Sequence, residues 1–236
     1  MVQAVVKLAE RAALAPLLGE LHGRVLELMA SQHGNFVLQA IVTDLPTAMS
    51  GFVVRELLPA AGRVARHRFG CRVICRFVEH SSSDDEALDQ LLEELLGKAG
   101  ELGELCKHPF AHYVVECILE HLPEHRTRIA AVLRADPLGI ACHRCAAHVV
   151  DAALTHCSEA DCAALVLALL GSSGEHTLTL AQHQHGSIVL SAVLKVPCSI
   201  SEQAHSQLLK SISLVKRTKH GLRLLQDSGL VADDTA

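Results

Sequence analysis

Three side chains near the start of the chain have the chemistry needed to bind a flat, polar ligand. Asn35 and Gln39 carry amides, which donate and accept hydrogen bonds, and Phe36 carries a flat ring. If residues 33–43 form a helix, positions i, i+1 and i+4 share one face, so the three side chains point the same way. An unpaired nucleobase offers flat faces and polar edges to such a set. These residues therefore predict stacking combined with hydrogen bonding to a base edge.

The same arrangement returns five more times along the sequence. Each copy has a small residue, a variable pair, two aliphatic residues and a residue that is usually polar. The sets, written as first, middle and last residue, are Cys71, Arg72 and Cys75; His112, Tyr113 and Glu116; Ala147, His148 and Asp151; Ser187, Ile188 and Ser191; and Leu222, Arg223 and Gln226. Five of the six middle residues are planar, although the chain has only five Phe, one Tyr and no Trp. Packing does not explain this bias, so we interpret the middle residues as stacking platforms.

The spacing of the copies predicts a repeat architecture. The last residues of the six sets follow one another at steps of 36, 41, 35, 40 and 35 residues. A period in this range is typical of stacked helical units. Residues 2–6 match residues 38–42 at the same interval, so we expect the sequence to begin inside a repeat helix, with an N-terminal part missing or divergent.

Each repeat is predicted to contain a short helix, a motif helix that carries the three-residue set, and an outer helix. In the second repeat these are expected at about 62–67, 70–80 and 84–97, with a helix cap within residues 81–84. Motif histidines at 33, 67, 108, 143, 183 and 220 recur just before or at the start of the motif, which indicates a structural role in the turn.

These patterns predict an all-α fold, an α-solenoid in which three-helix repeats form a curved superhelix. We expect one domain over residues 1–236 that begins with the end of a partial repeat at 1–20. The repeats are then predicted at about 21–61, 62–99, 100–135, 136–173, 174–209 and 210–236, and the last ends in a polar tail at 232–236.

Composition narrows the class of protein. Half of the residues are apolar but only 3% are aromatic, which suits helices packed through Leu, Ala and Val. The net charge is −5, with arginines concentrated between 63 and 76 and acidic residues between 84 and 104. The nine cysteines are irregularly spaced, as expected for reduced core residues of an intracellular protein. No signal peptide or membrane-length apolar run is visible, so we expect a monomer in the cytoplasm, with the nucleus or nucleolus as alternatives.

Cysteine and histidine are also close together between residues 142 and 157, which raises the alternative of a zinc site. A lone C-x-x-C, here Cys142 and Cys145, is a weak signal without a second pair, and we favour a core position for Cys145. No nucleophile, base and orienting group recur together. We therefore predict no catalytic residue, no metal ligand and no cofactor.

Residues 32–39, Gln-His-Gly-Asn-Phe-Val-Leu-Gln, closely resemble the base-reading helix of Pumilio-type (PUF) repeats, and residues 69–74 resemble it nearly as well. The resemblance extends over essentially the whole chain and identifies it as a divergent or truncated member. It implies a curved α-solenoid that binds single-stranded RNA on its concave face, one base per repeat, often in mRNA 3′ untranslated regions.

The resemblance also assigns roles within each set. First and last residues contact the base edge and the middle residue stacks. Asn35, Phe36 and Gln39 match the pattern associated with uracil. The Cys71 set begins like an adenine reader but has Cys75 where Gln is expected, and the His112 set is loosely similar to a guanine reader. The remaining three sets match no pair that we can decode.

The resemblance implies single-stranded RNA, with mRNA as the expected class, as the partner, and a role in post-transcriptional and translational regulation. It implies further protein partners on the convex face, no membrane partner, and RNA running antiparallel to the repeats. Two alternatives remain open from the sequence. One is a helical-repeat scaffold that binds proteins instead, and the other is a non-specific RNA binder in ribosome biogenesis.

Overall fold

A computed structural model describes residues 2–81, 85–97, 100–197 and 199–231, and every regular element within these ranges is a helix. Most of the cap predicted at 81–84 and the polar tail predicted at 232–236 lie outside the described residues. The chain divides into two compact units, Met1–His121 and Leu122–Ala236, each of which is described by itself. The prediction of one domain over residues 1–236 stays a prediction.

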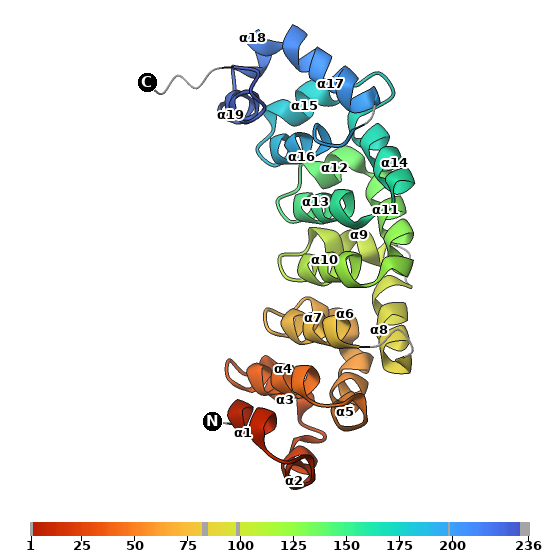
Figure 1. The fold of residues 1–236 in the computed structure, drawn as a ribbon, viewed down its shortest axis with the longest axis vertical. Coiled ribbons are helices and arrows are strands. Elements are labelled where there is room, and N and C mark those ends of the chain that lie inside the picture. The colour runs from red at the N-terminus through yellow and green to blue at the C-terminus, as the bar shows by residue number, and fades with distance from the viewer. Residues whose placement is uncertain (1, 82–84, 98–99, 198, 232–236) are drawn as a thin grey trace. The chain divides into compact units, whose positions relative to one another are not determined.

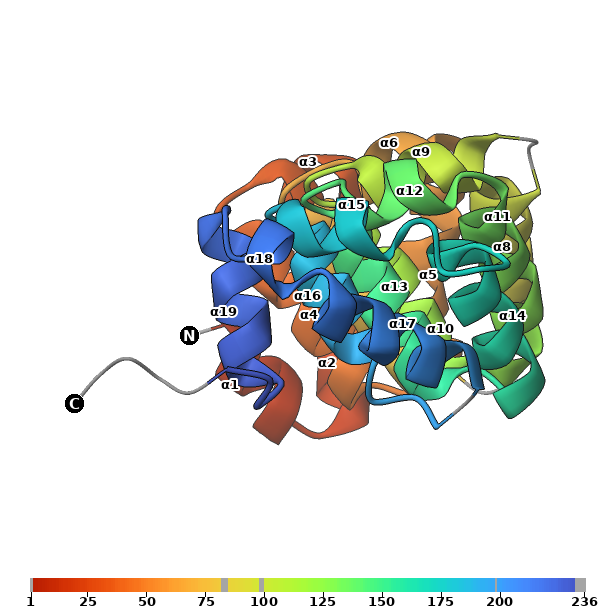
Figure 2. The same ribbon diagram turned by 90° about the horizontal axis from the view of Figure 1, so that it is seen from above.

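The first unit contains two helices of a partial repeat and then successive sets of three. The partial repeat gives α1 (Val2–Leu8) and α2 (Arg11–Leu21). The short helices are α3 (Val25–Ala30), α6 (Ala61–Ala65) and α9 (Glu101–Lys107); the motif helices are α4 (Gly34–Asp44), α7 (Gly70–His80) and α10 (His112–His121); the outer helices are α5 (Thr47–Leu57) and α8 (Glu86–Leu96). A 3-10 turn η1 (Leu58–Ala60) follows α5. Helices α1, α4, α7 and α10 pack side by side in this order (Figure 1), and α3, α6 and α9 lie along one edge of them (Figure 2).

The second unit repeats the pattern. Its outer helices are α11 (Arg126–Ala135), preceded by the 3-10 turn η2 (Pro123–His125), α14 (Glu159–Leu170) and α17 (Ser199–Lys210); its short helices are α12 (Pro137–Ala141), α15 (Thr177–Gln182) and α18 (Ile212–Val215); its motif helices are α13 (Ala146–His156), α16 (Gly186–Val193) and α19 (Lys219–Asp227). Motif helix α16 packs against both α13 and α19, while α14 packs between α11 and α17. The predicted order of short, motif and outer helix is confirmed in both units.

The motif helices start where a side chain caps their free backbone N–H groups. Nδ1 of His67 accepts from the backbone N–H groups of Phe69 and Gly70, both at 3.3 Å. The same bonds come from His108, His143 and His183 before the next three motif helices. The structural role predicted for these four histidines is confirmed.

That prediction was wrong for His33 and His220. The equivalent cap in the first repeat is Ser31, whose Oγ accepts from the N–H groups of His33 and Gly34 at 3.3 and 3.1 Å. In the last repeat it is Thr218, whose Oγ1 accepts from Gly221 N at 3.1 Å. His33 and His220 lie two residues after these caps, so the chemistry of an acceptor is retained while the residue type changes.

The small residue of the motif is required by close packing. A Cβ added to Gly34 would lie 2.6 Å from the carbonyl oxygen of Leu28 in the preceding short helix. Gly70, Gly186 and Gly221 face the equivalent carbonyls of Val64, Leu180 and Val215. The short helix therefore ends directly against the start of the motif helix and fixes its direction.

The core follows the helical periodicity of the sequence. In α4 the side chains of Leu38, Ile41 and Val42 are buried, whereas Val37, which the helical pattern also places on the core side, is half-buried. In the outer helix α8 the leucines are buried and the acidic residues Glu93 and Glu94 are exposed. Its cap is Asp85, which accepts from Ala87 N at 3.0 Å, so the cap lies one residue beyond the predicted 81–84 segment.

No helix within the described ranges has both the length and the apolar composition needed to cross a bilayer.

Candidate nucleic-acid interface

The middle residue of every predicted set lies on the surface. Phe36, Tyr113 and Ile188 are 48%, 53% and 58% exposed, which is unusual for large apolar side chains. Arg72, His148 and Arg223 are exposed as well. All six therefore lie where a ligand can reach them.

The first residues of the sets differ from the sequence-based expectation. Asn35 was placed on the exposed side of its helix, but its side chain is 0% exposed. The other first residues, Cys71, His112, Ala147 and Ser187, are buried too, whereas Leu222 is 36% exposed. The helical-face argument therefore failed for five of the six first residues, which are covered by the protein.

Most of these buried side chains bond to the turn before their helix. Asn35 Nδ2 donates to the carbonyl oxygen of Ser31 at 2.8 Å. His112 Nδ1 lies 2.8 Å from the oxygen of His108, and Ser187 Oγ donates to Gln184 O at 3.1 Å. Cys71 Sγ makes the corresponding contact with Arg68 O at 3.6 Å. These first residues stabilise the turn, and their predicted contact with a base edge stays a prediction.

The last residues of the sets are partly accessible. Gln39, Cys75, Glu116, Ser191 and Gln226 are half-buried, and Asp151 is exposed. Gln39 is oriented by Asn35, whose Oδ1 accepts from Gln39 Nε2 at 2.9 Å. Glu116 lies 3.8 Å from His112 Nε2 within its own set.

In the first unit, side chains from three predicted sets meet in one groove of about 530 Å³, which we call the first groove. It contains Gln39 from the first set, the whole Cys71 set, and Tyr113 and Glu116 from the third set. Phe36 and His112 do not line it. Because α4, α7 and α10 pack in sequence, neighbouring repeats contribute side chains to one continuous surface.

The second unit has a groove of about 550 Å³, the second groove, between its motif helices. It contains Asp151 from the fourth set, the whole Ser187 set and Arg223. Ala147, His148, Leu222 and Gln226 do not line it. The predicted residues are thus partly brought together in each unit.

Both grooves contain cationic side chains that sequence reasoning had not assigned to the site. Arg68 and Arg76 join the predicted Arg72 in the first groove, and Glu79, Glu116 and Glu120 line it as well, so the three arginines are matched by three carboxylates. Lys195 and Lys219 join Arg223 in the second groove, opposite Asp151 and Asp227. A sequence signal was available for two of these cationic side chains, because Arg68 and Lys219 each lie two residues before the motif glycine, Gly70 and Gly221.

Cys71 in the first groove is unsuited to nucleophilic chemistry. Burial, followed by the nearby Cys75, raises the pKa of the Cys71 thiol to about 11. A neutral thiol is a poor nucleophile at physiological pH.

The structure does not support the alternative of a zinc site within residues 142–157. Cys145 is 5% exposed in the core, as expected, and His143 uses Nδ1 as a helix cap. Among the described residues, the group of three close metal-ligating side chains lies elsewhere in the chain.

Comparison with known proteins gives a family match. The sequence profile described as Pumilio-family RNA binding repeat matches residues 24–58, 62–96, 102–133, 138–170 and 176–190, which is more than half of the chain. Motif helix α19 lies beyond the matched segments, but it has the same glycine contact and packs against α16.

Individual proteins match over most of the chain. The Pumilio homology domain family member 4 of Saccharomyces cerevisiae is 22% identical over 211 residues, covering 85% of this chain and 23% of that protein. The chain spans less than a third of the length of the curated relatives that it matches.

Solved structures share the fold. The structure of PUF-8 in complex with PBE-RNA aligns with a TM-score of 0.87 at 17% identity, covering 97% of this chain and 67% of that one. The Puf4 RNA binding domain, bound to the HO endonuclease RNA 3′ UTR recognition sequence, aligns with a TM-score of 0.82 at 20% identity, covering 96% and 72%. The predicted fold class, an α-solenoid of three-helix repeats, is confirmed.

Proposed function

This chain belongs to the Pumilio family of RNA binding repeats, and we propose that it binds single-stranded RNA along its motif helices. The observation that carries the proposal is the exposure of all six middle residues, five of them planar, on consecutive motif helices. Bases stack on Phe36, Arg72, Tyr113 and His148, and each stacked base contributes about 1–3 kcal/mol. The similar solved structures, described with 3′ UTR RNA, support this function over a protein-binding scaffold.

In the first unit, stacking and base-edge contacts are assigned to different side chains. Tyr113 presents a ring from α10, and Arg72 presents a flat guanidinium from α7, one repeat away. Gln39, Cys75 and Glu116, one helical turn after the stacking residues, face base edges. The amide of Gln39 both donates and accepts, whereas the Glu116 carboxylate only accepts when ionised, so the repeats select different bases.

The second unit is proposed to bind RNA with less base selection. Ile188 lacks a planar surface, and the small side chains of Ser187 and Ser191 reach little of a base edge. Lys195, Lys219 and Arg223 in the second groove instead supply charge for the phosphate backbone.

We further propose that the target is mRNA, that the protein acts in post-transcriptional regulation, and that it works in the cytoplasm. Residues 1–236 would act as one repeat domain, with the outer helices α5, α8, α11 and α14 left free to bind protein partners.

Selection of bound sequences from a random RNA pool tests the proposal. We expect enrichment of a short unpaired motif containing a uracil at the position that contacts Phe36 and Gln39. Because the RNA is proposed to run antiparallel to the repeats, this uracil lies 3′ of the base that stacks on Tyr113. Phe36→Ala together with Gln39→Ala should then relax selection at that uracil and leave the 5′ positions unchanged. Recovery of no enriched motif, together with equal affinity for duplex RNA, would contradict base recognition.

A further inference from the structure

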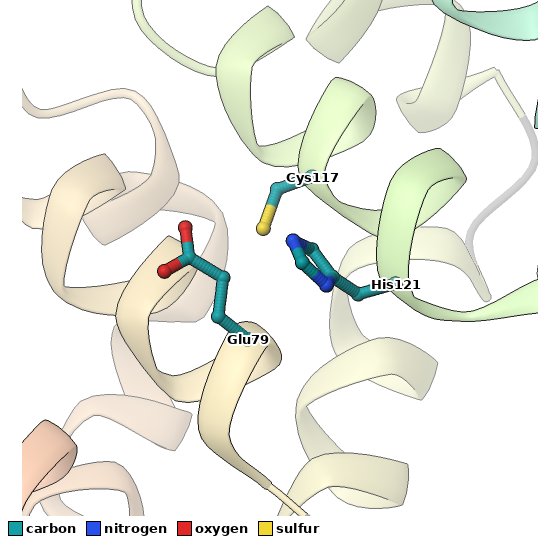
Figure 3. Close-up of side chains that lie close together, drawn as sticks. All are labelled: Glu79, Cys117 and His121. Atoms are coloured by element: carbon teal, nitrogen blue, oxygen red, sulfur yellow. The ribbon is translucent and has the colours of Figure 1, made fainter. Parts of the chain in front are cut away.

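One cluster of side chains in the first unit has the composition of a transition-metal site. Glu79, Cys117 and His121 each offer one ligand atom, and these atoms all lie within 4.8 Å of one another. Figure 3 shows the Cys117 sulfur pointing between the carboxylate of Glu79 and the ring of His121. We propose that these three residues bind a zinc ion between motif helices α7 and α10.

The helices hold the donors in a suitable arrangement. Cys117 and His121 are four residues apart on α10, so both side chains lie on the same face, one turn apart. Glu79 comes from α7, which packs directly against α10. Zinc binds thiolate at about 2.3 Å and imidazole or carboxylate at about 2.0–2.2 Å, so an ion among the three atoms requires only small side-chain shifts.

The chemistry of the three donors favours zinc over the alkaline-earth ions. Thiolate and imidazole are ligands of zinc and other borderline or soft metals, whereas calcium and magnesium require sets made of oxygen atoms. The exposure of the two ligands on α10 also suits a metal site. Cys117 is 7% exposed and His121 is exposed, so the thiol anchors the ion from the protein side while solvent has access for metal entry.

The contacts that the three side chains make without metal are weak or replaceable. Glu79 pairs with Arg76, whose side chain is 46% exposed and free to turn into solvent. His121 Nε2 lies 3.8 Å from a carboxylate oxygen of Glu120, and Cys117 Sγ donates to the carbonyl oxygen of Cys75 at 3.5 Å. Binding replaces the Cys117 proton by the metal and releases that proton to solvent.

Cys75 lies four residues before Glu79 on α7, but its thiol donates to the carbonyl oxygen of Tyr113 at 3.6 Å, and its sulfur is not one of the three clustered ligand atoms. The fourth position of a tetrahedral ion bound by Glu79, Cys117 and His121 is therefore assigned to a water molecule.

Titration of the full chain with Co²⁺ in the presence of a phosphine reductant tests the proposal. Co²⁺ serves as a spectroscopic substitute for Zn²⁺, and the native chain should gain sulfur-to-cobalt charge-transfer absorption in the near ultraviolet that added Zn²⁺ removes. His121→Gln, at an exposed position, should weaken Co²⁺ binding by at least about tenfold, judging from the tenfold to hundredfold losses caused by altering residues around a metal. Cys117→Ala should abolish the absorption.

Two variants outside the cluster serve as matched controls. His125 lies 3.8 Å from Glu124, as His121 does from Glu120, but it is outside the cluster, so His125→Gln should leave binding unchanged. Cys142→Ser tests whether residues 142–157 bind the metal instead, and it should also leave Co²⁺ binding unchanged. Circular dichroism verifies folding of each variant.

Charge-transfer absorption that is absent from the native chain, or that persists unchanged in His121→Gln, would overturn the proposal. RNA affinity measured on chelator-treated protein is a separate test, so the outcome for zinc does not decide the outcome for RNA.

Discussion

Gln39 donates through Nε2 to the Oδ1 of Asn35 at 2.9 Å, one helical turn away on α4. Asn35 is fully buried and also donates to Ser31 O, so its amide is already used by the protein on both sides. The pair assigns different roles to two residues of the same set. We propose that Asn35 acts as a positioning residue that holds the amide of Gln39 toward the ligand.

Asn35→Ala and Gln39→Ala should therefore differ in their effect on stability. Asn35→Ala removes two side-chain hydrogen bonds, the one to Ser31 O and the one from Gln39 Nε2, and should lower the free energy of unfolding by about 1–3 kcal/mol, or about 0.5–1.5 for each bond. Gln39→Ala removes only one of these two bonds and should lower it by about 0.5–1.5 kcal/mol. Urea denaturation of both variants measures the difference, and equal losses would show that Asn35 is not the structural member of the pair.

Tyr113 is expected to contribute most of its binding energy through its ring. Tyr113→Ala should weaken binding to a selected single-stranded RNA by about 1–3 kcal/mol, the usual contribution of one stacked base. Tyr113→Phe should retain affinity because it keeps the ring. Leu167→Ala on outer helix α14 is the matched control, since Leu167 is an exposed apolar residue at 43% exposure. Fluorescence anisotropy at fixed salt gives the affinities, and a loss in Tyr113→Phe equal to that in Tyr113→Ala would assign the effect to the hydroxyl.

Arg72 is expected to contribute charge as well as a flat surface. Removing one phosphate contact reduces the slope of log affinity against log salt by about 0.7 for a single strand. Arg72→Gln should show this smaller slope, whereas Tyr113→Ala should lower affinity with the slope unchanged. Titrations at several salt concentrations distinguish the two, and an unchanged slope in Arg72→Gln would place its guanidinium away from the phosphates.

His108 should make stability depend on pH. Burial, followed by the positive charge of Arg66, lowers the pKa of His108, and Nδ1 must stay unprotonated to accept from Phe110 and Ala111. The unfolded state therefore takes up the proton first as pH falls. The contribution of His108 is fully present above its ordinary pKa of about 6.5 and is lost as pH falls through the lower folded value.

His108→Ser isolates this effect, because Ser31 caps the equivalent turn in the first repeat. The variant keeps an acceptor that does not titrate, so its stability relative to the native chain should increase as pH is lowered through 6.5. Thermal or urea unfolding at a series of pH values measures the difference. Parallel loss of stability in both proteins would exclude His108 as a titrating cap.

Any side chain at position 70 is expected to lower the stability of the protein. A Cβ there would approach the carbonyl of Val64 and lie 2.8 Å from Val64 Cγ1 and 3.0 Å from Met29 Sδ of the preceding repeat. Gly70→Ala should lower the free energy of unfolding by about 1–3 kcal/mol through this overpacking. Gly19→Ala in α2 is the control, because no atom lies within 4 Å of its added Cβ, and it should raise stability by about 0.5–1 kcal/mol. Stabilisation by both substitutions would contradict the packing role of Gly70.

The order of the helices could be predicted from the sequence because the motif itself marks where its helix begins. Gly70 marked the start of α7, and the predicted range 70–80 equals the observed helix. The cap of α8 was placed too early because several consecutive residues could accept the bond, and backbone geometry selected Asp85.

Burial within the motif was harder to predict. A helical wheel places Asn35 beside Phe36, but it does not include the turn before the helix, where the Asn35 side chain donates to Ser31 O. The cluster of Glu79, Cys117 and His121 gave no sequence signal either, since it joins residues from two repeats, and contacts of that kind become visible only once the helices are packed.

The most direct test of base stacking by the motif helices is the affinity of the Phe36→Ala, Arg72→Ala, Tyr113→Ala triple variant for an RNA selected by the native chain. We predict that the native chain prefers the single strand to the same sequence in a duplex, and that the folded variant loses at least about 3 kcal/mol of binding free energy, roughly 1 for each base. Affinity equal to that of the native chain would contradict the claim that these exposed side chains receive the RNA.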